Sequence, residues 1–303
     1  MSVVMRSVMA GVAILTVPAV MNVARAVDDR PPFIPRPAPV TVVKPGQMAL
    51  SPDGDRVAIA DRFGNRINIV NSHGELVWSV GEGVAIEQPT AVMFASSSEL
   101  IFSQWESHRL FRVAEKTPTQ IDTLEDFSAA VGPRARIIKL CGLRNRSILA
   151  LTTRPDGLVR FDADGKKSTV LIKAGSGKGR LDRPVACAEL MSGRIAVAQG
   201  GAYPVQVFDS DGGFLFAADW NSPTPRENWE AAAVAVDRRE SIWVADATRA
   251  QFRQYDPTGT LLSVRSFASP NRFPADMAIT GDNQLMVIDE DGRLDLYDLS
   301  QEN

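Results

Sequence analysis

The chain has 303 residues, with 33 Lys or Arg and 36 Asp or Glu, so its formal net charge is −3. Nucleic-acid-binding domains need a basic face to neutralise phosphates, and this mildly acidic composition argues against nucleic acid as a partner. Only 2 histidines and 2 cysteines are present, which leaves too few histidines for a three-histidine zinc site.

The first 26 residues have the features of an export signal. Arg6 supplies a positive charge, an apolar stretch follows, and Ala24-Arg25-Ala26 fits a small-x-small cleavage site. The apolar stretch is shorter than the about 20 residues that span a bilayer; an uncleaved anchor is the alternative. We expect cleavage after Ala26, a mature formal charge of −5 because Arg6 and Arg25 are lost, no transmembrane segment, and a periplasmic or secreted protein.

Residues 27–39 are rich in proline and predict an extended lead-in. Beyond them a short apolar stretch recurs six times, 43 to 48 residues apart, which is the period of a β-propeller blade. The copies read DRVAIAD, SELIFSQ, RSILALT, GRIAVAQ, ESIWVAD and NQLMVID, and they end at Asp61, Gln104, Thr152, Gln199, Asp246 and Asp289.

Each copy predicts one four-stranded blade. In the fifth copy the strands fall at 233–236, 241–245, 251–255 and 260–264, with polar or Pro- and Gly-containing turns between them. The sixth copy ends after 294–299, where its outer strand would begin, and residues 39–43 can supply that strand. The sequence therefore predicts an all-β, six-bladed propeller over residues 40–303, a single domain closed by an N-terminal strand that completes the last blade.

The repeats resemble those of the NHL family. The matching motifs are Arg183-Pro184-Val185-Ala186, the VQVFD strand at 205–209, the following Ser210-Asp211-Gly212 turn, and Asp61 with Asn65-Arg66. The resemblance implies a six-bladed propeller but selects no function, because such propellers serve as enzymes and as protein- or RNA-binding modules. Similar virginiamycin-lyase-like propellers use a histidine base, which gives His108 an enzymatic alternative.

The two cysteines form a disulfide candidate. Cys141 and Cys187 each precede a strand copy by a similar distance, so both are expected on the innermost strands of neighbouring blades. A bridge needs Cα atoms within about 7 Å of each other. Two small buried thiols are the alternative.

Equivalent positions around the ring give the candidate site. The repeated strands end in carboxylates on blades five, six and one. A second set of equivalent positions has arginines on blades six, one and two. Asp276 adds a carboxylate near the entry of blade six, and His108 lies in a rim loop. The candidate ligand-binding residues are Asp61, Arg66, Gln104, His108, Arg109, Asp246, Asp276, Asp289 and Arg293.

These sets of equivalent positions have a structural and a functional interpretation. The carboxylates can accept N–H groups of their own loops, and the arginines can pair with them between blades. Alternatively, the charged sector binds a protein partner or a small polar or anionic ligand. No cofactor is predicted, and Ca²⁺ bound by the carboxylates is the weaker possibility.

We expect from the sequence a non-catalytic binding module that uses one charged rim. The alternative is a metal-assisted hydrolase or lyase, with Ca²⁺ or Zn²⁺, that uses the rim carboxylates with His108. The identity of the ligand and the oligomeric state do not follow from the sequence.

Overall fold

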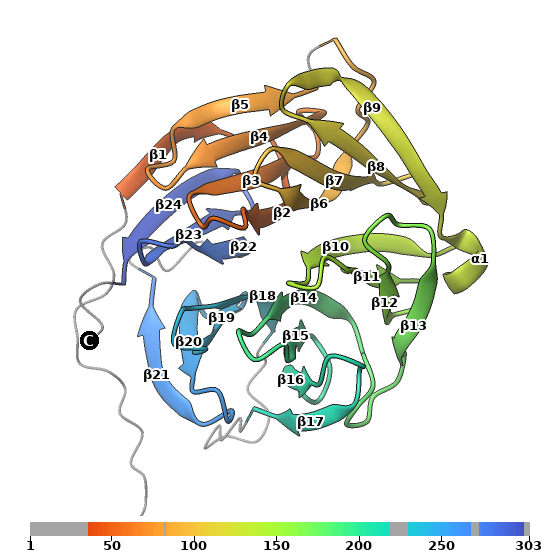
Figure 1. Ribbon diagram of the computed structural model, residues 1–303. Coiled ribbons are helices and arrows are strands. Elements are labelled where there is room, and N and C mark those ends of the chain that lie inside the picture. The colour runs from red at the N-terminus through yellow and green to blue at the C-terminus, as the bar shows by residue number, and fades with distance from the viewer. Residues whose placement is uncertain (1–35, 82, 219–229, 268–272, 300–303) are drawn as a thin grey trace, which may run out of the picture.

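The structure, a computed structural model, describes residues 36–81, 83–218, 230–267 and 273–299. Six four-stranded antiparallel sheets stand in a ring around a central axis (Figure 1). The prediction of an all-β, six-bladed propeller is therefore confirmed. The expected export signal at 1–26 lies outside the described residues, as does 27–35 of the lead-in. Within the described ranges, no helix combines the length and apolar character needed to cross a membrane.

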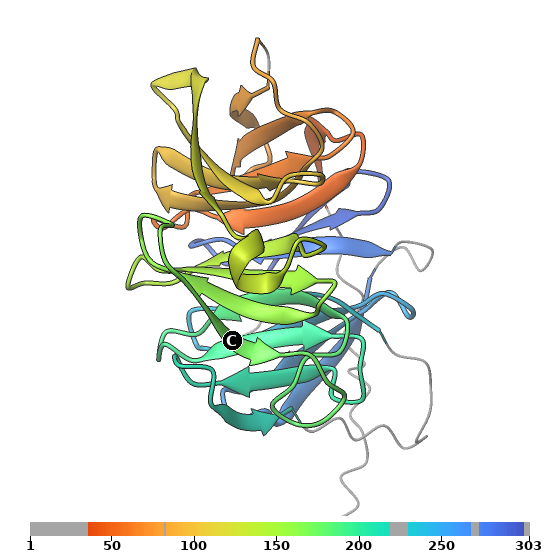
Figure 2. The ribbon, with the colours of Figure 1, turned by 90° about the vertical axis from the view of Figure 1, so that its right-hand side faces the viewer.

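The first three blades follow the chain from the innermost strand outward. Blade one contains β2 (Pro45–Leu50), β3 (Arg56–Asp61), β4 (Arg66–Asn71) and β5 (Leu76–Val80). Blade two contains β6 (Pro89–Ser96), β7 (Glu99–Gln104), β8 (Arg109–Ala114) and β9 (Thr117–Asp126). Blade three contains β10 (Arg136–Gly142), β11 (Ile148–Thr153), β12 (Gly157–Phe161) and β13 (Ser168–Lys173). The short helix α1 (Ser128–Val131) links blades two and three at the outer surface of the ring (Figures 1 and 2).

Blades four and five repeat this order. Blade four contains β14 (Pro184–Glu189), β15 (Ile195–Gln199), β16 (Val205–Phe208) and β17 (Phe214–Ala217). Blade five contains β18 (Ala231–Val236), β19 (Ile242–Asp246), β20 (Gln251–Tyr255) and β21 (Leu261–Ser266). The four strands predicted in the fifth copy are all present, and the third has the predicted bounds.

Both ends of the described chain build blade six. It contains β22 (Pro274–Ile279), β23 (Gln284–Asp289) and β24 (Arg293–Asp298), and its outer strand is β1 (Arg36–Thr41). Strand β1 pairs antiparallel with β24, with Pro37 opposite Asp295 and Thr41 opposite Arg293. The predicted closure is confirmed, although the closing strand begins within the Pro-rich segment.

Gly292 permits the close approach of the two chain ends. Its φ is +84°, and a Cβ placed there would overlap the carbonyl oxygen of Val42. Only glycine adopts this conformation at no steric cost. The turn before β24 therefore depends on the absence of a side chain.

The apolar core lies between the blades. Six clusters of buried side chains are present in the described ring, and each joins two neighbouring sheets. Between blades five and six, for example, the Phe252 ring meets the Tyr297 ring edge-on at 5.6 Å. Sheets buried on both faces need strands that are apolar at consecutive positions. This requirement explains the uninterrupted apolar runs of β15 and β19, whose residues are all buried.

A disulfide links blades three and four. Cys141 on β10 is bonded to Cys187 on β14, with 6.3 Å between their Cα atoms. Both side chains are buried. Of the two alternatives for these cysteines, the bridge between neighbouring inner strands is confirmed.

Replacing both cysteines with alanine should lower the free energy of unfolding by about 4 kcal/mol, because the bond closes a loop across 46 positions. Urea unfolding of the oxidised wild type and the double variant measures this difference. A reductant should bring the wild type to the level of the variant and leave the variant unchanged. Equal midpoints before reduction would show that the bond contributes no stability.

Candidate functional site

One layer of residues surrounds the axis at the start of the inner strands. Each inner strand carries a one-residue irregularity. The next residue of the inner strand pairs with the residue just before the one that ends the repeated sequence stretch of the second strand. In blade one the equivalent residue is Gln47, which directly precedes Met48, the partner of Ile59. We call this set the axial layer; its members are Gln47, Ala91, Lys139, Ala186, Ala233 and Asp276. Three blades thus contribute alanine and three contribute a long polar or charged side chain.

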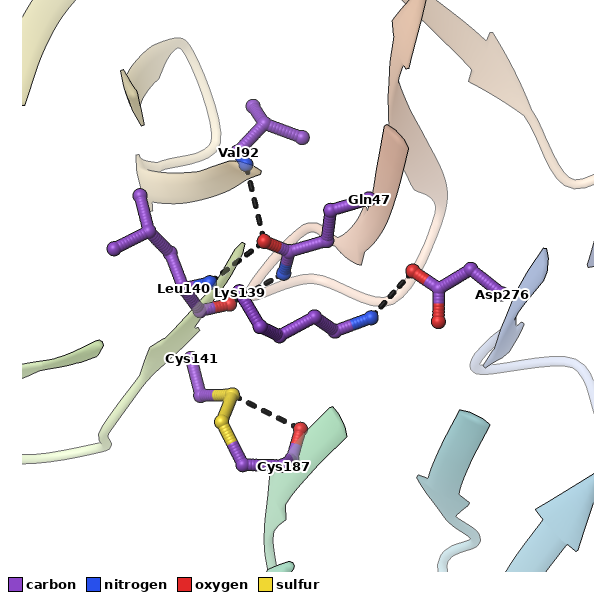
Figure 3. Close-up of a disulfide and its surroundings, with 7 residues drawn as sticks. All are labelled: Gln47, Val92, Lys139, Leu140, Cys141, Cys187 and Asp276. Carbon is purple, nitrogen blue, oxygen red and sulfur yellow. Dashed lines mark hydrogen bonds and ion pairs between the residues drawn. A yellow bond between two sulfur atoms is a disulfide. The ribbon is translucent and has the colours of Figure 1, made fainter. Parts of the chain in front are cut away.

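Lys139 and Asp276 form an ion pair across the channel. Their blades, three and six, stand opposite each other in the ring, and Lys139 Nζ contacts Asp276 Oδ2 (Figure 3). The side chains are only 7% and 3% exposed. Asp276 Oδ2 also accepts the N–H of Met48 at 2.5 Å, and Oδ1 accepts the N–H of Met277 at 2.9 Å. Three donors therefore fix the carboxylate in place.

Gln47 joins three blades beside this pair. Its Oε1 accepts the N–H groups of Val92 at 3.1 Å and Leu140 at 2.6 Å, and its Nε2 donates to the carbonyl of Leu140 (Figure 3). The side chain is buried. Gln47, Lys139 and Asp276 are thus all buried in the axial layer, and Gln47 and Lys139 border the cavity described next.

A large cavity opens from the axial layer toward the ends of the inner strands. Its volume is about 1140 Å³, and all six inner strands line it. Gln47 and Lys139 lie at its closed end, and the disulfide-bonded Cys141 and Cys187 form part of its wall. Among the lining residues that the inner strands contribute, Lys139 and Glu189 are the charged ones. The rest of the inner-strand wall is mostly apolar, as is usual for small-molecule sites. Residues of other segments add further charges to the lining: Glu99, Arg112, Arg144, Arg146, Asp162 and Asp164.

Glu189 is a half-buried carboxyl on the cavity wall. Its Oε2 accepts the N–H of Arg144 at 2.8 Å, whereas the Arg144 guanidinium donates to the carbonyl of Met191 at 3.1 Å. Burial raises the pKa of Glu189 above its ordinary value of 4.5, and the hydrogen bond and charge of Arg144 oppose that rise. A carboxyl with a raised pKa is better suited to proton exchange near neutral pH.

The carboxylates and amides that end the second strands hold the rim together. Asp61 Oδ1 accepts N–H groups of Val43, Lys44 and Gly64 at 3.0 to 3.2 Å. In blades two and four, glutamine takes the same role toward the segment that enters the inner strand: Gln104 accepts the N–H of Glu87 and Gln199 that of Asp182. These hydrogen bonds agree with a structural role for the residues that end the second strands, which is to accept backbone N–H groups of the loops.

Asp246 and Asp289 close their own loops. Asp246 Oδ1 accepts the N–H of Thr248 at 2.9 Å and that of Arg249 at 3.2 Å, and burial raises the pKa of Asp246. Asp289 Oδ1 accepts the N–H groups of Asp291 and Arg293 at 3.1 and 2.9 Å. Each carboxylate is thus engaged by the turn that follows its strand.

The rim arginines do not pair between blades in the contacts described. Arg66 Nε lies 3.2 Å from Asp61 Oδ2 in the same blade, and Arg293 Nε lies 2.9 Å from Asp295 Oδ1. Arg109 begins β8 opposite Asp126 of β9. Both ion pairs lie within single blades, whereas Arg66 also donates to the carbonyl of Thr41 on β1 of blade six at 3.5 Å. The pairing of these arginines with carboxylates of neighbouring blades stays a prediction.

His108 belongs to the rim between blades two and three. Its Nε2 lies 2.8 Å from Arg136 Nη1, and its ring meets that of Phe127 edge-on. A guanidinium only donates, so Nε2 accepts and the proton of a neutral ring is assigned to Nδ1. Asp276, in contrast, binds Lys139 in the channel. The structure therefore does not join His108 and Asp276 into one site.

The residues do not fit a Ca²⁺ or Zn²⁺ centre. Within the described ranges, no group of three or more His, Cys, Asp or Glu side chains is placed to hold a metal ion. Calcium takes six to eight oxygen ligands, whereas the oxygens of Asp61 are engaged by N–H groups and Arg66. At the axis, the ammonium of Lys139 already occupies the cation position beside Asp276.

Solved structures with the same fold include enzymes. A virginiamycin B lyase from Staphylococcus aureus has a TM-score of 0.62 and 12% identity, over 85% of this chain and 81% of that one. A gluconolactonase from Xanthomonas campestris has a TM-score of 0.63 and 13% identity, over 89% and 99%. A calcium-binding regucalcin from Agrobacterium tumefaciens has a TM-score of 0.64 and 12% identity, over 88% and 94%.

No family model and no curated protein matches the sequence. The comparisons support a six-bladed propeller similar to those of lactonases and virginiamycin B lyases, and membership of the NHL family is not shown. They also correct the functional expectation: a non-catalytic binding module is the weaker interpretation, because the similar propellers include a lyase and a lactonase. At this identity the likeness establishes the fold and no particular reaction.

Asp61→Ala should lower the free energy of unfolding by about 1–3 kcal/mol, because it leaves the part-buried N–H donors of Val43, Lys44 and Gly64 without their acceptor. Asp61→Asn keeps one acceptor oxygen and should lose less. Chemical denaturation measures both, and the exposed Asp55→Ala is the matched control. If Asp61→Ala lost no more stability than Asp55→Ala, the structural role of the residues that end the second strands would be contradicted.

Glu189→Gln should become more stable relative to the wild type as pH rises. The raised pKa means that the folded state favours protonated Glu189, so ionisation costs stability above the folded pKa and costs nothing below the ordinary value of 4.5. Urea midpoints at about pH 4 and about pH 8 measure the change. Glu87→Gln, at an exposed position, controls for the loss of one carboxylate. A gap that widens toward low pH would contradict the prediction.

Proposed function

We propose that the protein is an enzyme of the hydrolase or lyase class, with the axial cavity as its active site. The observation that carries the proposal is the buried Lys139–Asp276 ion pair, whose lysine lines a cavity with mostly apolar inner-strand walls. A buried ion pair contributes little net stability, because the cost of removing two charges from water offsets their attraction. The presence of the pair in a layer where three other blades carry alanine supports a catalytic role for it.

Lys139 is the proposed charge-stabilising residue. Hydrolysis of an ester or lactone and elimination next to a carbonyl both develop negative charge on an oxygen, which a fixed cation in a water-poor site stabilises. An ammonium has three N–H donors, and among the described residues Asp276 is the acceptor that Lys139 contacts. The other two donors are available to a substrate oxygen. Asp276 and Gln47 are positioning residues in this scheme.

Glu189 is the proposed proton-transfer residue nearer the mouth. It lies three residues beyond the axial layer on β14, which corresponds to about 10 Å along a strand. A substrate that reaches from Lys139 toward the mouth passes both groups. The positive charge in this scheme comes from Lys139, so the metal-assisted use of rim carboxylates with His108 is not retained.

We also propose that the protein works outside the cytoplasm. The disulfide between blades three and four is compatible with an extracellular or periplasmic location, because such bonds persist in oxidising compartments. The export-signal features of residues 1–26 support the same location.

Removing the charges of both Lys139 and Asp276 should strongly lower kcat and preserve the fold. Lys139→Met alone leaves Asp276 buried without its partner and is expected to destabilise the protein by about 3–5 kcal/mol. Lys139→Met combined with Asp276→Leu removes both charges, which by itself is often neutral for stability. The N–H groups of Met48 and Met277 lose their acceptor in this variant, at a cost of about 1–3 kcal/mol each. Turnover of a panel of lactones, carboxylic esters and β-substituted carbonyl compounds should fall about 10²–10³-fold in kcat.

The control is Lys116→Met, which removes an exposed lysine outside the cavity. It should keep wild-type turnover. Circular dichroism and a urea midpoint establish that the double variant is folded. A folded double variant with wild-type kcat would place the chemistry elsewhere and contradict the proposal.

A further inference from the structure

We infer that the axial cavity takes an elongated, uncharged and largely apolar molecule that presents a carbonyl oxygen to Lys139, such as an apolar ester, lactone or ketone. The inference rests on the proposed function, because it assigns the substrate class of the same cavity. It differs from the small polar or anionic ligand expected from the sequence. Three properties of the cavity support it: its walls, the charge at its closed end, and the hydrogen-bonding groups there.

The walls favour an apolar body. The lining residues of the inner strands are mostly Met, Ala, Leu, Val, Ile, Cys and Phe. Other segments add charged residues to the lining: Glu99, Arg112, Arg144, Arg146, Asp162 and Asp164. The apolar strands favour burial of apolar ligand surface along the cavity. The volume of about 1140 Å³ slightly exceeds the usual range for drug-sized ligands, about 300–1,000 Å³.

The charge at the closed end favours a neutral head group. Lys139 and Asp276 are in contact and compensate each other. A carboxylate placed on Lys139 would also lie close to Asp276, and it would bring an unpaired charge into a mostly apolar wall, which is costly. An ammonium head group would meet Lys139 instead. A neutral dipole avoids both costs.

The hydrogen-bonding groups select an acceptor. Gln47 Oε1 already accepts two N–H groups, and Asp276 accepts three hydrogen bonds. Lys139, in contrast, has N–H donors left once Asp276 has taken one. A carbonyl oxygen accepts such hydrogen bonds and donates none. An alcohol or amine head group would bring an O–H or N–H donor beside Gln47 and Asp276, whose acceptor oxygens already take hydrogen bonds.

Matched ligands test the inference without any turnover. Methyl decyl ketone, dodecanoate and dodecylamine share a long alkyl chain and differ in head-group charge, and gluconolactone is neutral but polar. Isothermal titration calorimetry should show that the ketone binds at least about tenfold more tightly than the other three, since it alone combines an uncharged carbonyl acceptor with an apolar chain. The ketone cannot be hydrolysed, so its binding is read separately from catalysis.

Two variants locate the binding. In the folded double variant Lys139→Met with Asp276→Leu, the ketone should bind about tenfold more weakly, with the preference over dodecanoate lost. Ala188→Phe fills part of the cavity wall away from the axial layer and should weaken every alkyl ligand. Lys116→Met should change neither.

Three results would overturn the inference: tighter binding of dodecanoate, tighter binding of gluconolactone, or no binding of any alkyl ligand. The outcomes separate the two proposals. Ketone binding by a protein that turns over no lactone, ester or β-substituted carbonyl compound overturns the proposed reaction class alone. Turnover of polar substrates without ketone binding overturns the substrate class alone.

Discussion

Every sheet in this ring is covered on both faces by its neighbours, and the rest of the structure depends on that mutual burial. Six apolar clusters fill the six spaces between blades. A ring with one blade missing would expose two apolar sheet faces, which water disfavours. Closure is therefore a condition of stability, and the β1–β24 pairing secures it.

Polar chemistry is confined to the two places that blade packing leaves open, the rim and the axis. At the rim, the side chains that end the second strands satisfy backbone N–H groups of the loops, as Asp61 and Gln104 show. At the axis, alanines on three blades leave room for Gln47, Lys139 and Asp276 to cross the channel. Gln47 and Lys139 form the polar part of the cavity lining at this layer, with Asp276 paired to Lys139.

The fold could be predicted from the sequence because blade repetition is a local pattern. The strand at Gln251–Tyr255, the shared last blade and the Cys141–Cys187 pair all follow from it. The Lys139–Asp276 ion pair does not follow from the repeat, because its members lie 137 positions apart. In addition, the irregularity early in each inner strand decides which residue reaches the axis. Aligning the inner strands from the ends of the second strands would have shown Lys139 and Asp276 in one column. The rim residues could be identified from the repeat. Their hydrogen-bond partners could not, because these depend on loop geometry.

The shared last blade also sets the order in which the molecule can be completed. Strand β1 is made early, yet its partner in the described ring is β24, near the other end of the chain. Its backbone groups therefore stay unpaired while blades one to five emerge from the ribosome or cross a membrane. The covered ring, and with it the closed wall of the cavity, can form only after synthesis has reached the last strand.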